Sequence, residues 1–397
     1  MSARPVVGIG VIGFGWMGQA HSRGFRRVPS FFQQRPADPR LVICSDTIAE
    51  RRTEAVEGFG FESATDDWHD VVDHPDVQIV VITTPNMLHL QIVQAAAANG
   101  KHIFCEKPVG GTPAQTVAAE LAARRAGVIS GVGYNYRWVP LVQHAKAIID
   151  AGRIGTITNY RGRFLSNYGS DPLGLLSWRF LVDQAGYGVS TDILSHSMDL
   201  AMFLNGPIAS VTGLGHTFIT ERPLPTVGGT HYDRGKAGDP TGTVTNEDWF
   251  GAITRFTNGS VGTFEACRSM VGPESQNAFE IFGTEGSITW NFEKMNELRV
   301  YFANGTKETG YTTVFGGDRF PFHGNFVPGN ANSIGFEDLI TIEDSEFLRA
   351  VAEHRSFHPG FEEAVDFVSV QDALLRSWES GQWVDVSSLR APDGAPA

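Results

Sequence analysis

Residues 6–18 decide the fold of this chain, and they read Val6-Val7-Gly8-Ile9-Gly10-Val11-Ile12-Gly13-Phe14-Gly15-Trp16-Met17-Gly18. The apolar run before Gly13 predicts a strand buried on both faces, as parallel strands in α/β proteins are. The glycines then follow the G-x-G-x-x-G pattern, in which Gly13 allows a tight turn, Gly15 close approach of a pyrophosphate, and Gly18 packing of a helix on the strand. A helix that begins here directs its N-terminal amides at the phosphates. Strand, glycines and helix together predict a dinucleotide-binding site.

Further apolar runs follow, separated by stretches with helical patterning. The runs lie at residues 41–45, 78–83, 102–105 and 128–132. Because strands that alternate with helices form a parallel sheet, this part of the chain is predicted to be a doubly wound α/β domain. The segment 28–40 contains three prolines, and we expect a loop there.

The pattern changes near residue 134. Alternating strands with tight turns follow, and helices return at 342–354 and 362–380. A chain of 397 residues is also too long for one ordinary core. We therefore expect a Rossmann domain over residues 1–134. An α+β domain for substrate binding and oligomerisation is expected over 135–397, with a large, mostly antiparallel open sheet and C-terminal helices that can pack back on the first domain.

An aspartate ends the second predicted strand. In a dinucleotide-binding fold, an acidic side chain at the position of Asp46 accepts hydrogen bonds from the adenosine ribose hydroxyls. Arg51 and Arg52 lie just beyond, where an arginine can hold a 2′-phosphate. Because the carboxylate of Asp46 repels such a phosphate, we favour NAD over NADP.

Composition and charge limit the partners of the chain. The formal net charge is −13, which argues against nucleic acid or an anionic membrane as the main partner. No apolar run approaches the roughly 20 residues of a membrane span, and nothing resembles a signal peptide, so we expect a cytoplasmic protein. The three cysteines have no metal-ligand spacing, and no metal site is expected.

Several motifs together resemble those of the glucose-fructose oxidoreductase / inositol dehydrogenase / MocA family. The motifs are the glycine stretch 13–18, Thr84-Pro85-Asn86 with His89, Glu106-Lys107-Pro108, Tyr134-Asn135-Tyr136-Arg137, and Asp192 with His196. Glu-Lys-Pro after a strand, with Asp-x-x-x-His downstream, is specific to this family among dinucleotide-binding proteins. Two positions depart from its usual pattern: Tyr187 interrupts a glycine run, and Ser195 stands where glycine is common.

The resemblance implies roles for particular residues. The catalytic group would be Lys107, Asp192 and His196. The cofactor would be bound by Gly13, Phe14, Gly15, Trp16, Met17, Gly18, Asp46, Thr84, Pro85, Asn86, His89, Glu106, Lys107, Trp178 and Arg179. Trp178 and Arg179 could equally be a stacked structural pair. The substrate would contact Lys107, Tyr136, Asn167, Asp192 and His196, and Tyr168 and Asp171, close to Asn167, could also bind sugar hydroxyls. The second-domain sheet would form a homodimer or homotetramer.

These side chains suit the oxidation of a secondary alcohol, which needs a hydride acceptor and a base for the hydroxyl proton. His196 titrates in the range of a base near neutral pH. Lys107 would lie at the carboxyl end of a parallel strand, where ligands bind, and its charge would favour a developing alkoxide. Asp192, four residues before His196 on a predicted helix, would share its face and either orient the imidazole or hold a neighbouring hydroxyl. Both lysine and histidine remain candidates for the base, and we favour a relay that uses both.

The reading favoured by these motifs is an NAD-dependent dehydrogenase for a cyclitol such as inositol, a pyranose, or an anhydrosugar such as levoglucosan. One alternative is an NAD-retaining enzyme that cleaves glycosides through transient oxidation at C3. Another is a non-catalytic regulator that senses sugar or NAD, and the intact set of Lys107, Asp192 and His196 argues against it.

Overall fold

In the computed structural model, the chain divides into two compact units, and the residues described are 4–225, 232–303, 305–307 and 309–390. The first unit comprises residues 4–138, 334–366 and 389–390, and the second comprises 139–333 and 367–388. The first unit therefore extends four residues past the expected boundary at 134. It also takes up a later helix, α10 (Phe336–Ala352), which packs against α1 (Trp16–Phe31).

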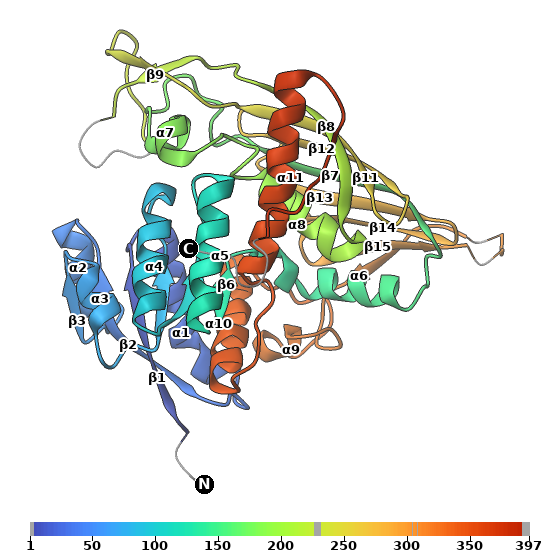
Figure 1. Ribbon diagram of the computed structural model, residues 1–397. Coiled ribbons are helices and arrows are strands. Elements are labelled where there is room, and N and C mark those ends of the chain that lie inside the picture. The colour runs from blue at the N-terminus through green and yellow to red at the C-terminus, as the bar shows by residue number, and fades with distance from the viewer. Residues whose placement is uncertain (1–3, 226–231, 304, 308, 391–397) are drawn as a thin grey trace. The chain divides into compact units, whose positions relative to one another are not determined.

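A parallel sheet of six strands forms the centre of the first unit (Figure 1). The strands are β1 (Val6–Ile12), β2 (Asp38–Ser45), β3 (Ser63–Thr65), β4 (Ile79–Ile82), β5 (His102–Cys105) and β6 (Ser130–Val132). Their order is β3-β2-β1-β4-β5-β6, and all neighbouring pairs are parallel. Strands β2 and β3 are added on one side of β1, and β4, β5 and β6 on the other. In such folds, dinucleotides bind at this reversal of strand order, here between β1 and β4. This confirms the predicted doubly wound sheet.

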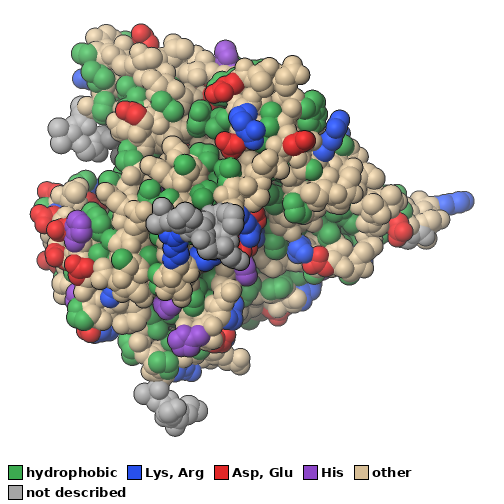
Figure 2. Space-filling model, viewed as in Figure 1, with side chains coloured by type: hydrophobic (Ala, Val, Ile, Leu, Met, Phe, Trp, Pro, Cys, Tyr) green, Lys and Arg blue, Asp and Glu red, His purple; other side chains and the backbone are tan. Residues whose placement is uncertain are grey.

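Helices connect these strands. They are α1, α2 (Ala49–Glu57), α3 (His69–Asp73), η1 (Asn86–Leu88), α4 (His89–Ala98), α5 (Pro113–Ala126) and η2 (Asn135–Trp138). The apolar runs of the strands are buried, as in β4, where all four side chains are fully buried. On the face shown in Figure 2, acidic side chains gather over α2 and α3, where Asp66, Asp67, Asp70 and Asp73 are exposed.

The segment 28–40 is not the loop that we expected. Helix α1 continues to Phe31 with Pro29 in its last turn, and β2 begins at Asp38. The last carbonyl groups of a helix lack partners within it. Here the guanidinium of Arg35 donates to the carbonyl of Pro29 over 3.0 Å and binds the carboxylate of Asp38 over 2.5 Å. Arg35 therefore ends the helix and fixes the start of the strand within a few residues.

The second unit is built on a sheet of nine strands, in the order β16-β15-β14-β13-β7-β12-β11-β8-β17. The strands are β7 (Ile157–Ser166), β8 (Ile208–His216), β11 (Trp249–Phe256), β12 (Val261–Cys267), β13 (Ser275–Gly283), β14 (Gly286–Asn291), β15 (Glu297–Phe302), β16 (Thr312–Phe315) and β17 (Val384–Asp385). All neighbouring pairs are antiparallel except β7 and β12. The predicted large, mostly antiparallel sheet is confirmed.

One face of this sheet is covered by helices. Helix α8 (Leu194–Asn205) packs on β7, β12 and β13, and α6 (Pro140–Asp150) lies against β15. The part of α11 (Phe361–Ser380) that belongs to this unit lies against β8 through Leu374 and Trp378. The remaining short elements are η3 (Trp178–Phe180), α7 (Val182–Ala185), β9 (Glu221–Pro223), β10 (Thr241–Thr243), η4 (Phe292–Lys294) and α9 (His323–Phe326). Among the residues that the structure describes, no helix combines the length and apolar character needed to cross a membrane.

Candidate active site

The glycine turn after β1 is held rigidly by its neighbours. Gly13 has φ +90, a backbone conformation that favours glycine, and its amide donates to the carbonyl of Ser45 over 2.7 Å. The hydroxyl of Thr83, after β4, donates to the carbonyl of Gly13 over 2.5 Å. A Cβ on Gly18 would lie 2.0 Å from that same carbonyl oxygen, so only glycine lets α1 approach the turn.

The start of α1 has the properties of a phosphate site. Gly15 is the N-cap, no described side chain caps it, and the first turn contains no acidic residue. A Cβ built on Gly15 would meet no described atom within 4 Å. Free amides, the positive end of the helix dipole and open space at Gly15 therefore fit the pyrophosphate of a dinucleotide.

Two residues within the glycine motif have side chains with different surroundings. Phe14 is fully buried and makes edge contacts with the rings of Phe59 and Phe61, at 4.9 and 5.9 Å between centroids. Phe14 can therefore reach a cofactor only through its backbone. Trp16 is 59% exposed and stacks on Phe336 of α10 at 5.5 Å. Its ring faces solvent beside the glycine turn.

Asp46, at the end of β2, is tied to the glycine turn. Its Oδ2 accepts a hydrogen bond of 2.7 Å from the amide of Phe14, and its Oδ1 accepts one of 2.9 Å from the amide of Ile48. Arg51 lies 3.4 Å from Oδ2, and Arg52 donates to the carbonyl of Asp46 over 2.8 Å. The carboxylate is thus fixed beside the turn, and both nearby arginines are engaged with Asp46.

The turn after β4 carries the Thr84-Pro85-Asn86 motif into η1 and α4. His89 is buried, and its Nδ1 and Nε2 each lie 2.8 Å from a carbonyl oxygen, those of Pro108 and Thr84 respectively. Both ring nitrogens are therefore occupied within the unit. His89 therefore joins the turn after β4 to the turn after β5.

Lys107 follows β5 at the same edge of the sheet. It is half-buried, and its amide donates over 3.1 Å to Oε2 of the preceding residue, Glu106. The peptide bond from Lys107 to Pro108 is cis. Tyr136, in η2 after β6, is buried with its ring 6.4 Å from that of Phe336. The carboxyl ends of β1, β2, β4 and β5 therefore present the predicted residues of the first unit along one edge.

In the second unit, Asp192 lies outside the helix on which we expected it. Helix α8 begins at Leu194, so His196 is helical, whereas Asp192 lies in the turns before it. The hydroxyl of Ser195 donates to the carbonyl of Asp192 over 2.7 Å. The carboxylate of Glu247 accepts the amides of Gly188 and Ser190, both over 2.8 Å. These bonds hold the chain in turns where the sequence pattern indicated a continuous helix.

The carboxylate of Asp192 has two neighbours from other segments. Tyr168, just after β7, donates its hydroxyl to Oδ2 over 2.8 Å, and the guanidinium of Arg179 lies 3.6 Å from the same oxygen. The guanidinium of Arg179 also lies 4.6 Å above the ring of Trp178, so these two residues do form a stacked pair. Burial and the charge of Asp192 raise the pKa of Tyr168 well above its usual value, which keeps its hydroxyl a donor. Asn167 is exposed.

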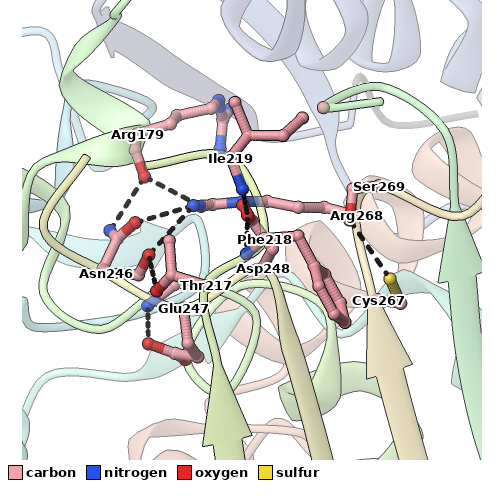
Figure 3. A network of polar contacts seen from close by, with 12 residues as sticks. Arg179, Thr217, Phe218, Ile219, Asn246, Glu247, Asp248, Cys267, Arg268 and Ser269 are labelled. Atoms are coloured by element: carbon pink, nitrogen blue, oxygen red, sulfur yellow. Dashed lines mark hydrogen bonds and ion pairs between the residues drawn. The ribbon is translucent and has the colours of Figure 1, made fainter. Parts of the chain in front are cut away.

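A buried polar network supports the segment that carries Arg179 (Figure 3). Arg268 donates to Oδ1 of Asp248 and to Oδ1 of Asn246, both over 2.8 Å, and to the carbonyl of Arg179 over 3.3 Å. Asn246 donates to the same carbonyl over 3.0 Å. The backbone of Arg179 is therefore fixed by two buried side chains.

No motif in the sequence indicates these supporting residues. Asn246, Glu247 and Asp248 are three consecutive buried polar residues directly before β11. Three polar residues at the start of a strand, with no turn-forming glycine or proline, are the available signal. Their partners lie far away along the chain, so the sequence did not indicate which segments they join.

Both units of the chain match known proteins in sequence. Residues 7–134 match the family described as oxidoreductase family, NAD-binding Rossmann fold, and residues 142–289 match the GFO/IDH/MocA C-terminal domain. Levoglucosan dehydrogenase of Pseudarthrobacter phenanthrenivorans is 38% identical over 96% of this chain and 99% of that protein. The scyllo-inositol 2-dehydrogenase (NAD(+)) of Bacillus subtilis is 29% identical over 75% of this chain and 77% of its own length.

Solved structures agree with these sequence matches. Levoglucosan dehydrogenase in complex with NADH and levoglucosan superimposes with a TM-score of 0.90 at 38% identity, covering 96% of this chain and 99% of the other. The same enzyme with NADH and L-sorbose gives a TM-score of 0.92, covering 97% and 100% of the two chains. This chain therefore belongs to the glucose-fructose oxidoreductase / inositol dehydrogenase / MocA family of NAD-binding oxidoreductases.

Proposed function

We propose that this chain is an NAD-dependent dehydrogenase that oxidises a secondary alcohol of a sugar or cyclitol, with an anhydrosugar of the levoglucosan type as its substrate. The observation that carries this proposal is the 38% identity to levoglucosan dehydrogenase across almost the full length of both chains. That enzyme has been solved with NADH and levoglucosan, and with NADH and L-sorbose. The free amides of α1 and the fixed carboxylate of Asp46 support the choice of cofactor.

The catalytic roles follow from the chemistry of the side chains. NAD⁺, when bound, supplies the hydride acceptor. Lys107 and His196 are the two groups suited to take the hydroxyl proton, and a cationic Lys107 favours the alkoxide that develops. Asp192, whose Oδ2 accepts from Tyr168, is a carboxylate that can hold a substrate hydroxyl or orient the imidazole. We favour a relay in which both Lys107 and His196 take part.

The surroundings of Asp46 favour NAD over NADP. Its carboxylate is fixed by two backbone amides, so it cannot turn away from a 2′-phosphate. Arg51 and Arg52 are engaged with Asp46 itself. A phosphate in this place would meet a fixed negative charge, whereas ribose hydroxyls would find a hydrogen-bond acceptor.

The face of the nine-stranded sheet opposite α8 is our proposed surface for self-association. On three neighbouring strands, Leu214, Ile253 and Val261 are 58, 49 and 44% exposed. The pairing register places them on the same face as the exposed side of β11. Apolar side chains that share an exposed sheet face are typical of a protein interface. A homodimer or homotetramer through this face is our proposal.

The first experiment tests the reaction. The purified protein, supplied with NAD⁺, is expected to form NADH with levoglucosan faster than with inositols, glucose or glycosides. NADH formation is followed by absorbance at substrate concentrations below KM, so that the rates compare kcat/KM. No NADH from any member of the panel would contradict the dehydrogenase. Cleavage of a glycoside without net NADH would instead indicate an enzyme that retains NAD.

The second experiment tests Lys107. The variant Lys107→Met is expected to bind NADH normally while kcat falls roughly 10²–10⁴-fold, the range for a positioned acid–base group. His196→Ala should be similarly damaging, and the double variant should lose much less than the product of the two, because both side chains serve one proton transfer. The kcat/KM of the unmodified enzyme should rise with pH, since the base acts in its unprotonated form.

A matched control lies at the other end of the same strand. Lys101 precedes β5, and its ammonium donates to the carbonyls of His74 and Val77, both over 2.8 Å. Lys101→Met should lower thermal stability while kcat stays close to that of the unmodified enzyme. Normal turnover by Lys107→Met would overturn the proposed role of this lysine.

The third experiment tests cofactor choice. Asp46→Asn keeps an oxygen that can accept from the amide of Phe14 but removes the charge. The preference of kcat/KM for NAD⁺ over NADP⁺ should shrink by about 1–3 kcal/mol, the scale of a hydrogen bond to a charged group. Asp76→Asn removes an exposed carboxylate before β4, at the opposite edge of the sheet, and should leave the ratio unchanged. An unaltered ratio in Asp46→Asn would contradict this role.

The fourth experiment tests self-association. Light scattering at micromolar concentration should give the unmodified protein a mass of two or four chains. Ile253→Glu and Leu214→Glu should shift it toward one chain, because burying an unpaired carboxylate in an interface is costly. Val56→Glu, at a 38% exposed site on α2, is the matched control and should not change the mass. A monomeric unmodified protein would refute the proposed interface.

A further inference from the structure

A buried histidine on α1 connects two acidic side chains from distant parts of the first unit. His21 is fully buried; its Nδ1 lies 2.7 Å from Oδ1 of Asp344 on α10, and its Nε2 lies 3.3 Å from Oε1 of Glu106 after β5. Asp344 is also fully buried, and Glu106 is 8% exposed. The mechanism proposed above does not use His21 or Asp344.

The charges of this cluster indicate that His21 is an imidazolium. Burial lowers its pKa, but the charge of Asp344 and hydrogen bonds to Asp344 and Glu106 outweigh burial and raise the pKa to about 10. Both ring nitrogens therefore donate. Glu343, beside Asp344, accepts from the indole of Trp138 over 3.2 Å, and burial raises its pKa well above the usual value, which favours its neutral form. One buried cation thus faces two carboxylates.

Glu106 transmits the position of His21 to Lys107. One of its oxygens faces the imidazole, and the other accepts the amide of Lys107 over 3.1 Å. The carboxylate packs closely against the backbone just after β6, because a Cβ built on Gly133 would lie 2.8 Å from Oε2 and only glycine fits there. On the far side of Lys107, the carbonyl of Pro108 lies 2.8 Å from Nδ1 of His89. The turn that carries Lys107 is therefore held at both ends by buried histidines.

We propose that His21 is a positioning residue for catalysis: clamped by Asp344, it fixes the carboxylate of Glu106 and through it the backbone from which Lys107 reaches the substrate. This inference rests on the proposed function of Lys107. It assigns a role in turnover to a residue of α1 that lies outside the glycine motif. Its removal is expected to act on kcat more than on cofactor binding, since the phosphate site at the start of α1 does not involve the imidazole.

Variants at His21 and Asp344, alone and combined, distinguish the positioning of Glu106 from the mere loss of a side chain. His21→Gln leaves Asp344 and Glu106 without their shared cation, and Asp344→Asn leaves His21 with one carboxylate. In the double variant, the two amides can bind each other, and Gln at position 21 can still donate to Glu106. The double variant also has the same net charge as the unmodified cluster, because it removes one cation and one anion.

The experiment measures kcat with saturating NAD⁺ and the best substrate of the panel, together with NADH binding by fluorescence and thermal unfolding. We expect His21→Gln to lose roughly 10- to 100-fold in kcat, the scale of a misplacement by about 1 Å, while the Kd for NADH changes less than about threefold. The double variant should regain most of the lost kcat, because the two residues form one unit. Glu106→Asp, too short to reach both partners, should lose kcat like His21→Gln.

The controls separate the possible failures. His323 in α9 is also buried, with Nε2 2.7 Å from the carbonyl of Asn332, and His323→Gln should lose stability without losing kcat. Near-normal kcat in His21→Gln, or a folded double variant that regains none, would overturn the inference. If His21→Gln does not fold, Glu106→Asp decides: unchanged kcat overturns the inference. Normal turnover in Lys107→Met, run alongside, would instead reject the proposed role of Lys107 on which the inference rests.

Discussion

The first unit depends on hydrogen bonds to the backbone at the ends of its parallel strands. Where each strand stops, the backbone turns and needs hydrogen-bond partners that the sheet no longer supplies. Asp46 provides them for the amide of Phe14, Thr83 for the carbonyl of Gly13, and Glu106 for the amide of Lys107. The side chains that complete the fold at this edge are therefore among the residues proposed to serve the cofactor, or are next to them in sequence. A change at this edge affects stability and function together.

In the second unit, buried charged side chains fix the backbone of the segments near Asp192. Arg222 and Arg268 are both buried, and their guanidinium groups lie 4.0 and 4.5 Å from the ring centre of Phe180. Asp248 pairs directly with Arg268, whereas Arg222 donates to the carbonyls of Asp171 and Gly169, and burial lowers its pKa to about 10. Buried charges are seldom a source of net stability. Here they fix the segment just after Tyr168 and the backbone of Arg179, two residues whose side chains contact Asp192.

Local sequence was sufficient where the deciding contacts are local. The run His102–Cys105 forms β5 at the predicted bounds, and Thr112 caps α5 by accepting the amide of Gln115, while Gly127 ends that helix with φ +66. Other features depend on distant partners. Asp192 does not lie on its predicted helix, because the carboxylate of Glu247 binds the amides of Gly188 and Ser190 in the turns before it. Glu247 is 59 and 57 positions from these two residues. The pairing of His21 with Asp344 joins residues 323 positions apart, and no pattern in either segment indicates it.

The chain is acidic, and the pyrophosphate of a dinucleotide is also negatively charged. The acidic side chains over α2 and α3 are exposed to solvent, where salt screens them beyond about 8–10 Å. The proposed phosphate site at Gly15 relies on backbone amides and the helix dipole, which involve no side-chain charge. Helix α1 also has no acidic residue in its first turn that would oppose that dipole. The local field at the start of one helix can therefore favour a phosphate that the net charge of −13 would repel at long range.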